Sequence, residues 1–202
     1  MRLGPALLVC VAVGGAADFA HLSLSPRNAA ATTLVELSLA ELVSKSTLVV
    51  AGTPLDSRTV WEESTGGRGR RIVTYTRLRL DRVIDGQPSG DVWVRTLGGH
   101  VGDIGQHVEG EAVLAPEKPS LLFLRAFPDG THGVVGMSQG QFPLETPSDG
   151  PIRLMPPPGG GHFLAKAGQL AQGQMSARLA LSGQTLDAAA RLVLAERRPH
   201  VP

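Results

Sequence analysis

Residues 71–86, RIVTYTRLRLDRVIDG, carry the clearest structural signal in the chain. In the middle of this stretch, side chains suited to a core alternate with charged ones: Thr76, Arg77, Leu78, Arg79, Leu80 and Asp81. Successive side chains of a β-strand point to opposite faces, so the alternation predicts a strand with one buried and one solvated face. Val83 and Ile84 are both apolar and break the alternation, which predicts a β-bulge near Arg82.

More strands are expected before and after this one. β-Branched and apolar residues predict strands at 47–63, 91–98 and 120–127, and one or two more within 132–145. Turn-forming segments separate these strands at hairpin-like spacing, and no helical crossover intervenes. The chain is therefore predicted to be mainly β, with a small antiparallel barrel of five or six strands within residues 35–145.

Short helices are expected on both flanks of the barrel. Ser38 and Glu41 have the spacing of a capping box, which predicts a helix over 39–45. Thr185 can cap a C-terminal helix over 185–198. The apolar stripe of this second helix is narrow and rich in alanine, which favours docking onto the chain's own barrel.

Two further segments lack a periodic pattern. Residues 146–184 are rich in proline and glycine and predict a linker or an extended strap across the barrel. Within them, residues 166–182 have no convincing period. Residues 18–34, near the other end of the chain, predict a flexible leader.

The first 17 residues have the features of an export signal. Arg2 gives a positive start, residues 3–13 form an apolar run, and small residues follow up to Ala17, where cleavage is expected. The run is too short to span a bilayer comfortably, so an uncleaved anchor is only the alternative. The mature protein is predicted to be secreted or periplasmic, with no stable membrane anchor.

Composition narrows the chemistry of the mature protein. Cys10 is the only cysteine and lies in the predicted signal, which excludes disulfides, thiolate nucleophiles and cysteine-based zinc sites after cleavage. The formal net charge is +1 at pH 7, so no bulk field attracts nucleic acid or an anionic membrane. Neither nucleic acid nor a cofactor is expected as a partner.

Several segments resemble a family of uncharacterised secreted bacterial proteins. The similar segments, within residues 35–145, are LSLAELVSKSTLVVAGT, RIVTYTRLRLDRVIDG, VWVRTLGGHVGDIGQHVEGE, LLFLR and VVGMSQGQFPL. The resemblance implies an OB-like barrel, of the oligonucleotide/oligosaccharide-binding type, similar also to the inhibitory domain of tissue inhibitors of metalloproteinases. Related segments occur beside secreted metalloprotease domains, so a protease is an implied partner. The family offers no catalytic residue to carry over.

Residues 98–111, GGHVGDIGQHVEGE, collect polar side chains that invite comparison with a metal site. His100, Asp103 and His107 are the candidate ligands. Their spacing matches no zinc pattern, and a glycine-rich backbone holds ligands poorly. The prediction is a turn-rich loop with no metal and with polar groups facing water.

Residues 136–140, GMSQG, match the G-x-S-x-G pattern of a nucleophile elbow, with Ser138 as the nucleophile. Asp149 and His162 would complete a triad in the right chain order. An elbow requires a helix after the serine, however, and the prolines that follow here exclude one. The prediction is a strand with glycine kinks and no enzymatic activity.

Arginines concentrate on the strands and the turn of the first predicted hairpin. The candidate binding residues there are Arg68, Arg70, Arg71, Arg77, Arg79, Trp61 and Tyr75. Binding of single-stranded nucleic acid needs aromatic platforms, and aromatic residues make up only 4% of the chain. An anionic polysaccharide could use the same patch, but a solvated sheet face with cross-strand ion pairs is favoured.

The sequence thus predicts an exported, non-catalytic binding module. Its expected contact surface is formed by residues 62–71 and 98–111, and its expected partner is an extracytoplasmic protein or glycan. One alternative is an inhibitor or accessory domain of a secreted metalloprotease, which rests on the resemblance alone. The other is a hydrolase that uses Ser138 or a metal at His100 and His107.

Overall fold

The computed structural model describes residues 34–64, 67, 69–148, 150–158, 163–164 and 175–198. The chain divides into two compact units, Met1–Ala30 and Ala31–Pro202, and every described residue belongs to the second. The predicted signal at 1–17 and all but the last residue of the predicted leader lie outside the described residues. Both stay predictions.

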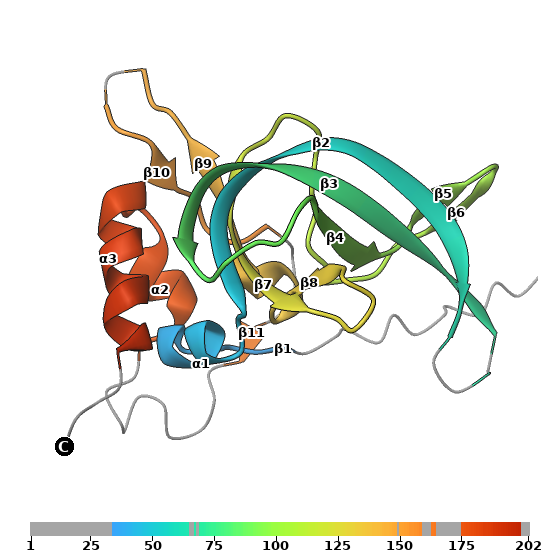
Figure 1. Cartoon of the computed structure of the whole chain (residues 1–202), viewed down its shortest axis with the longest axis horizontal. Helices are drawn as coiled ribbons and strands as arrows, with labels where there is room; N and C mark the ends of the chain where they lie inside the picture. The colour runs from blue at the N-terminus through green and yellow to red at the C-terminus, as the bar shows by residue number, and fades with distance from the viewer. Residues whose placement is uncertain are drawn as a thin grey trace, which may run out of the picture. The chain divides into compact units, whose positions relative to one another are not determined.

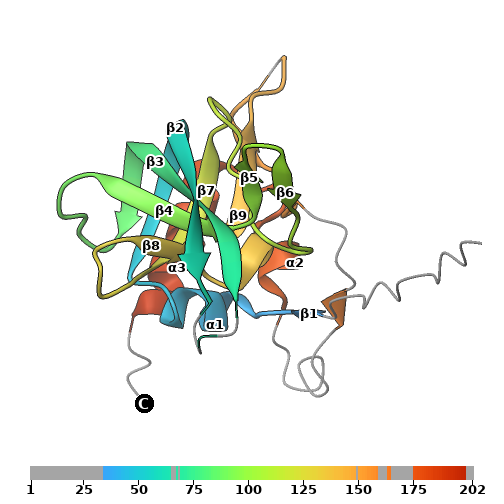
Figure 2. The ribbon, with the colours of Figure 1, turned by 90° about the vertical axis from the view of Figure 1, so that its right-hand side faces the viewer.

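Five strands close into a barrel, which confirms the predicted fold (Figure 1). They are β2 (Leu48–Glu63), β3 (Arg70–Asp85), β4 (Val92–Leu97), β7 (Ser120–Ala126) and β8 (His132–Val134). The first three form a meander, and the fifth lies between the third and the fourth in an OB-like order. Four pairings are antiparallel, but β4 and β8 meet in parallel at Val94 and His132, where Figure 2 shows them adjacent.

Irregular pairing lets the long β2–β3 hairpin bend around the barrel. Val49 faces Asp85 and Val50 faces Val83, so Ile84 is an extra residue. A second register shift follows at once, between Ala51 and Gly52. These shifts confirm the bulge predicted near Arg82, and bulges of this kind supply the curvature that barrel closure requires.

The sheet continues past the barrel into the predicted strap. β9 (Gln141–Glu145) pairs with β7, and β10 (Arg153–Leu154) pairs with β9. A short parallel pair joins β1 (Leu34–Val35) to β11 (Phe163–Leu164). Helix α2 (Ala177–Leu181) lies where the sequence showed no period, because five residues are too few for a helical repeat to be recognised.

Helices α1 (Leu39–Ser44) and α3 (Leu186–Arg197) cover one side of the barrel (Figure 1). The predicted capping box is present: the Glu41 backbone N–H donates to Ser38 Oγ, and the Ser38 backbone N–H donates to the Glu41 carboxylate. Docking of α3 on the barrel is confirmed by the burial of Ala189 and Val193 in the same apolar cluster as Val49. In the described ranges, no helix has both the length and the hydropathy needed to cross a membrane.

Two apolar clusters share strand β7 as a common wall. The first fills the barrel and contains Leu48, Val50, Leu78, Val92, Val94, Leu122 and Leu124. The second lies between barrel and helices and includes Val49, Leu121, Phe123, Phe142 and Leu154. Successive residues of β7 therefore face opposite cores, which explains why its sequence is apolar without alternation.

Candidate functional site

The two segments predicted as a contact surface come together at one end of the barrel. Residues 98–111 are not simply a loop, because β5 (Gly99–Val101) and β6 (Ile104–Gln106) form a hairpin. This hairpin lies beside the β2–β3 hairpin, at the end away from α3 (Figure 1). The prediction of a loop was wrong for these six residues because each strand is too short for its side chains to show a period.

Close packing at Gly99 brings the two hairpins into contact. Its φ is 124°, and a Cβ there would lie 2.4 Å from Thr74 Oγ1 and 2.8 Å from Thr59 Cγ2. Only glycine fits such a position without strain or displacement. The Ile72 backbone N–H also donates to Gln106 Oε1, with N and O 2.8 Å apart, so backbone and side chain both hold the hairpin.

A cavity of about 210 Å³, lined by both polar and apolar groups, lies between this hairpin and the open end of the barrel. Its inner wall consists of Thr74, Thr76 and Thr96, which point inward from β3 and β4 beyond the last apolar layer. The residues that line the rest are Leu97, Gly98, Gly99, Gln106, His107, Val108, Glu111, Ala112, Val113 and Leu114. The barrel core therefore ends in a row of hydroxyl groups rather than in aliphatic side chains.

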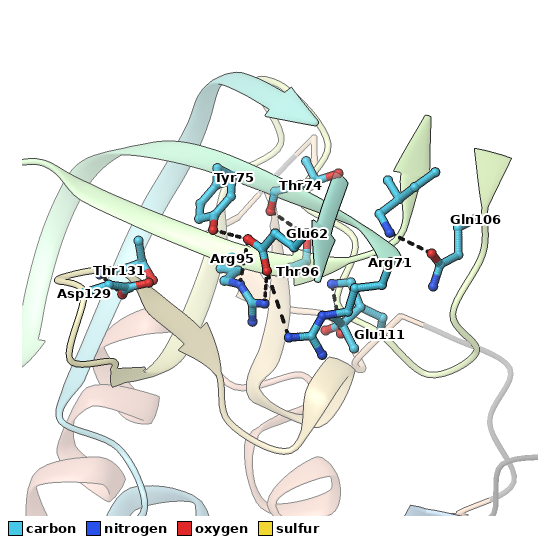
Figure 3. Close-up of polar contacts among 12 residues, drawn as sticks. Glu62, Arg71, Thr74, Tyr75, Arg95, Thr96, Gln106, Glu111, Asp129 and Thr131 are labelled. Carbon is cyan, nitrogen blue, oxygen red and sulfur yellow. Dashed lines mark hydrogen bonds and ion pairs between the residues drawn. The ribbon is translucent and has the colours of Figure 1, made fainter. Parts of the chain in front are cut away.

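Side chains pin the outer wall of the cavity in place. The Glu111 carboxylate accepts hydrogen bonds from the backbone N–H groups of Leu97, at 3.2 Å, and Ala112, at 3.0 Å. The Gln141 side chain accepts from the Val113 backbone N–H at 2.9 Å and donates to the Val113 carbonyl at 2.6 Å. Figure 3 shows Glu111 and Gln106 with Thr74 and Thr96. The cavity is thus preformed by its own chain.

A charged cluster joins β2, β3 and β4 on the outer face of the barrel. The Glu62 carboxylate accepts hydrogen bonds from Tyr75 Oη and from the Arg95 guanidinium, and Arg71 lies 4.0 Å away (Figure 3). The hydrogen bond from Arg95 holds the pKa of Glu62 below its usual range. Burial, together with the hydrogen bond to Glu62, raises the pKa of Tyr75. Glu62 is therefore ionised and Tyr75 neutral at neutral pH.

Most of the arginines and aromatic residues predicted to bind a ligand contact one another or acidic side chains. Arg70 lies over the Trp61 ring, with the guanidinium carbon 5.4 Å from the ring centre. Arg77 pairs with Asp56 at 2.8 Å, and Arg79 pairs with Asp81 at 2.9 Å. Arg58 covers the rings of Tyr75 and Trp93 at 5.1 and 5.7 Å. The Arg77–Asp56 pair joins β3 to β2, as the favoured alternative expects, whereas Arg79 and Asp81 both lie on β3. Arg68 lies outside the described residues.

The candidate metal ligands have separate neighbours. His107 lies 3.3 Å from the Glu109 carboxylate, and the His100 ring packs over Gly105, where a Cβ would lie 2.7 Å from Nε2. Asp103 lies in the tight turn between β5 and β6. No group of three or more His, Cys, Asp or Glu side chains that could hold a metal occurs in the described part of the chain.

Ser138 lies in a short 3-10 helix, η1 (Met137–Gly140), and not in the predicted kinked strand. Met137 and Gly136 both have positive φ, at 60° and 68°, so the chain turns sharply here and cannot continue as a strand. Ser138 is fully buried, whereas a nucleophile elbow exposes its serine. The other two residues of the hypothetical triad, Asp149 and His162, lie outside the described residues.

No protein-family model matches the chain, and no curated protein matches it either. The sequence resemblance to secreted bacterial proteins therefore stays a prediction. The cavity is the feature that sequence reasoning missed. The alternating pattern placed Thr76 on the inward face, but threonine suits either face of a strand and so gave no separate signal of a cavity.

Proposed function

We propose that the chain is an exported, non-catalytic binding module that contacts its partner with the hairpin end of the barrel. One observation carries the proposal: two separate hairpins meet around a preformed cavity that has both polar and apolar lining. Binding sites are commonly concave, largely preformed and built from loops on a rigid scaffold. The expected partner is an extracytoplasmic glycan or protein.

Preorganisation supports binding at this end. Residues 111–113 are fixed by Glu111 and Gln141, and the β5–β6 hairpin is fixed by Gln106 and by packing at Gly99. A surface that is already ordered loses little conformational entropy when it binds, so more of the contact energy appears as affinity.

The geometry of the site gives less support to the two alternatives, a hydrolase and an inhibitor of a secreted metalloprotease. A hydrolase would need Ser138 to be accessible, and this residue is fully buried. An inhibitor of a secreted metalloprotease has only the sequence resemblance in its favour. Assays of such proteases with and without the protein test this second alternative directly.

The test compares matched double variants. Arg70→Ser with Ile104→Ser changes one exposed residue on each hairpin, and Arg191→Ser with Leu194→Ser replaces one arginine and one aliphatic residue on α3. Immobilised wild type should retain a specific component of a cell-envelope extract. The hairpin variant should lose it at an unchanged melting temperature, while the α3 variant keeps it. Equal retention by all three proteins would contradict the proposal.

A further inference from the structure

We infer that the cavity at the open end of the barrel receives an uncharged, hydroxyl-rich ligand: a single sugar ring at the end or branch of a glycan. This inference rests on the proposed function and names the ligand class of the same site. It is argued from hydrogen-bonding capacity, from charge, and from the size and apolar part of the lining.

The inner wall offers hydroxyl groups with spare hydrogen-bonding capacity. Thr74 Oγ1 donates to the Gly98 carbonyl at 2.7 Å and lies 3.1 Å from Thr59 Oγ1, so it is engaged. Thr96 Oγ1 reaches the Thr74 carbonyl only at 3.5 Å, a long and weak bond. The Thr76 hydroxyl has no partner among the described residues, although the residue is only 2% exposed. Because a threonine hydroxyl both donates and accepts, Thr76 and Thr96 match the hydroxyl groups of a sugar.

The opposite wall adds a fixed acceptor. Each oxygen of the Glu111 carboxylate accepts one backbone N–H, from Leu97 or Ala112. A carboxylate offers about four acceptor positions, so capacity remains for donors that come from a ligand. Hydroxyl groups of a sugar supply such donors, and the backbone bonds hold the carboxylate in place to receive them.

The negative charge of Glu111 in the cavity lining disfavours an anionic ligand. Neither lysine nor arginine lines the cavity in the described part of the chain, and Glu111 contributes a carboxylate. The one basic side chain there, His107, lies next to Glu109. A phosphate, sulfate or carboxylate would meet Glu111 without a cation to balance it, so an anion is disfavoured.

Size and apolar surface narrow the ligand further. The volume of about 210 Å³ is below the roughly 300–1,000 Å³ typical of pockets for drug-sized ligands, which suits one ring rather than a chain. Val108, Val113 and Leu114 place aliphatic groups in the same lining. A sugar ring has hydroxyl groups at its edge and C–H groups on its faces, so this mixed lining fits it.

The first experiment titrates ¹⁵N-labelled protein with glucose, galactose, mannose and N-acetylglucosamine, each alone, and follows the amide resonances. Inorganic phosphate and methylammonium chloride probe the two charged classes. At least one sugar should cause saturable shifts at residues 74–76, 96–99 and 106–114, while phosphate and methylammonium cause none there. The absence of a saturable response to any of the four sugars, or a response there to a charged probe, would overturn the inference.

Variants separate the cavity from the fold. Thr76→Val removes the inward hydroxyl at nearly constant shape and should weaken sugar binding about 3- to 10-fold, as expected for one lost hydrogen bond. Val113→Trp, at a position 60% exposed, should fill the cavity and abolish binding while the protein stays folded. Thr53→Val is the matched control, because Thr53 is buried outside the cavity and bonds Asp81. Equal affinities in all three variants would contradict the assigned site.

Failure of the inference can be told apart from failure of the proposed function. If the hairpin end retains a partner that neither free sugars nor Thr76→Val affect, the binding module stands and the sugar ligand is wrong. If sugars bind and Thr76→Val weakens their binding, both the proposed function and the sugar ligand are supported. If the extract comparison and the sugar titrations are both negative, both are wrong.

Discussion

Buried polar atoms with no hydrogen-bond partner among the described residues include Ser138 Oγ, Ser182 Oγ and His132 Nδ1. A buried polar atom without a partner costs roughly 1–3 kcal/mol. Such sites differ from the cavity threonines, because Thr76 faces space that a ligand can enter.

Replacing Ser138 with alanine should stabilise the protein by about 1 kcal/mol, because the change removes an unsatisfied buried hydroxyl. Ser46→Ala is the control: Ser46 Oγ donates to the Leu42 carbonyl at 2.7 Å, so its loss should destabilise. Urea denaturation measures both free energies of unfolding. A loss of stability in Ser138→Ala as large as that in Ser46→Ala would show that the Ser138 hydroxyl is hydrogen-bonded.

His132 should make the fold sensitive to acid. Burial lowers the pKa of His132 below its ordinary value of 6.5, against the weaker opposing effects of the Trp93 backbone and Asp129. Below about pH 6.5 the unfolded chain therefore binds more protons than the folded one, so stability falls as the pH drops. The urea midpoint should decrease from pH 7 to pH 5.

Two variants isolate this contribution. His132→Gln should show a smaller decrease in the urea midpoint between pH 7 and pH 5 than the wild type. His107→Gln removes a histidine whose side chain is 83% exposed and should leave the decrease unchanged. If both variants kept the full decrease, His132 would not be its source.

Among the strands and hairpins, features set by a local sequence pattern could be predicted, and features set by long-range packing could not. The alternation along β3 could be predicted because one face of the strand is buried, and its break near Arg82 could be predicted for the same reason. The register shift between Pro54 and Ser57 was not predicted, although a proline inside a strand commonly marks a bulge. The position of the β5–β6 hairpin depends on contacts with Thr59 and Ile72, and no local sequence pattern indicates such contacts.

The contact at Gly99 predicts a marked difference between two glycines of this hairpin. Gly99→Ala should destabilise the protein by roughly 2–3 kcal/mol, from backbone strain and from collision with Thr74 and Thr59. Gly102 also has a positive φ, 58°, but a Cβ there would meet nothing within 4 Å. Gly102→Ala should therefore destabilise the protein by only about 1 kcal/mol.

Denaturation curves of the two variants measure these costs, and amide exchange at Ile72 reports whether the hairpin stays attached. The Ile72 N–H donates to the Gln106 side chain of the hairpin, so detachment of the hairpin would expose it. Faster exchange at Ile72 is therefore expected in Gly99→Ala and not in Gly102→Ala. Equal costs and equal exchange in both variants would contradict the packing described.

In the molecule as a whole, strand β7 couples the barrel to the helices. Leu122 and Leu124 face the barrel core, while Leu121 and Phe123 face the cluster that α3 completes. The barrel, the first helix and the last helix could be predicted from sequence, because each has its own periodicity. The cavity could not, since it needs the register of β3 against β4 and the path of residues 106–114 over them.

Sharing of β7 predicts that barrel and helices unfold together. Ala189→Asp places a charge at a fully buried position of α3 and should lower the melting temperature by well over 10 °C, whereas Ala195→Asp, at an exposed position, should change it little. Far-ultraviolet circular dichroism follows the helices, and the near-ultraviolet signal follows Trp61 and Trp93 in the barrel. Loss of helix while the tryptophan signal persists would show that the two parts are independent.

The hairpin end is best tested by mapping where the retained partner touches the protein. Hydrogen exchange of every amide, measured with and without the purified cell-envelope component, locates the contact. Protection is expected in residues 57–76 and 98–114, around the cavity, with no change in α3. Protection confined to α3 and α1, with exchange at the two hairpins unchanged, would contradict the proposed binding surface.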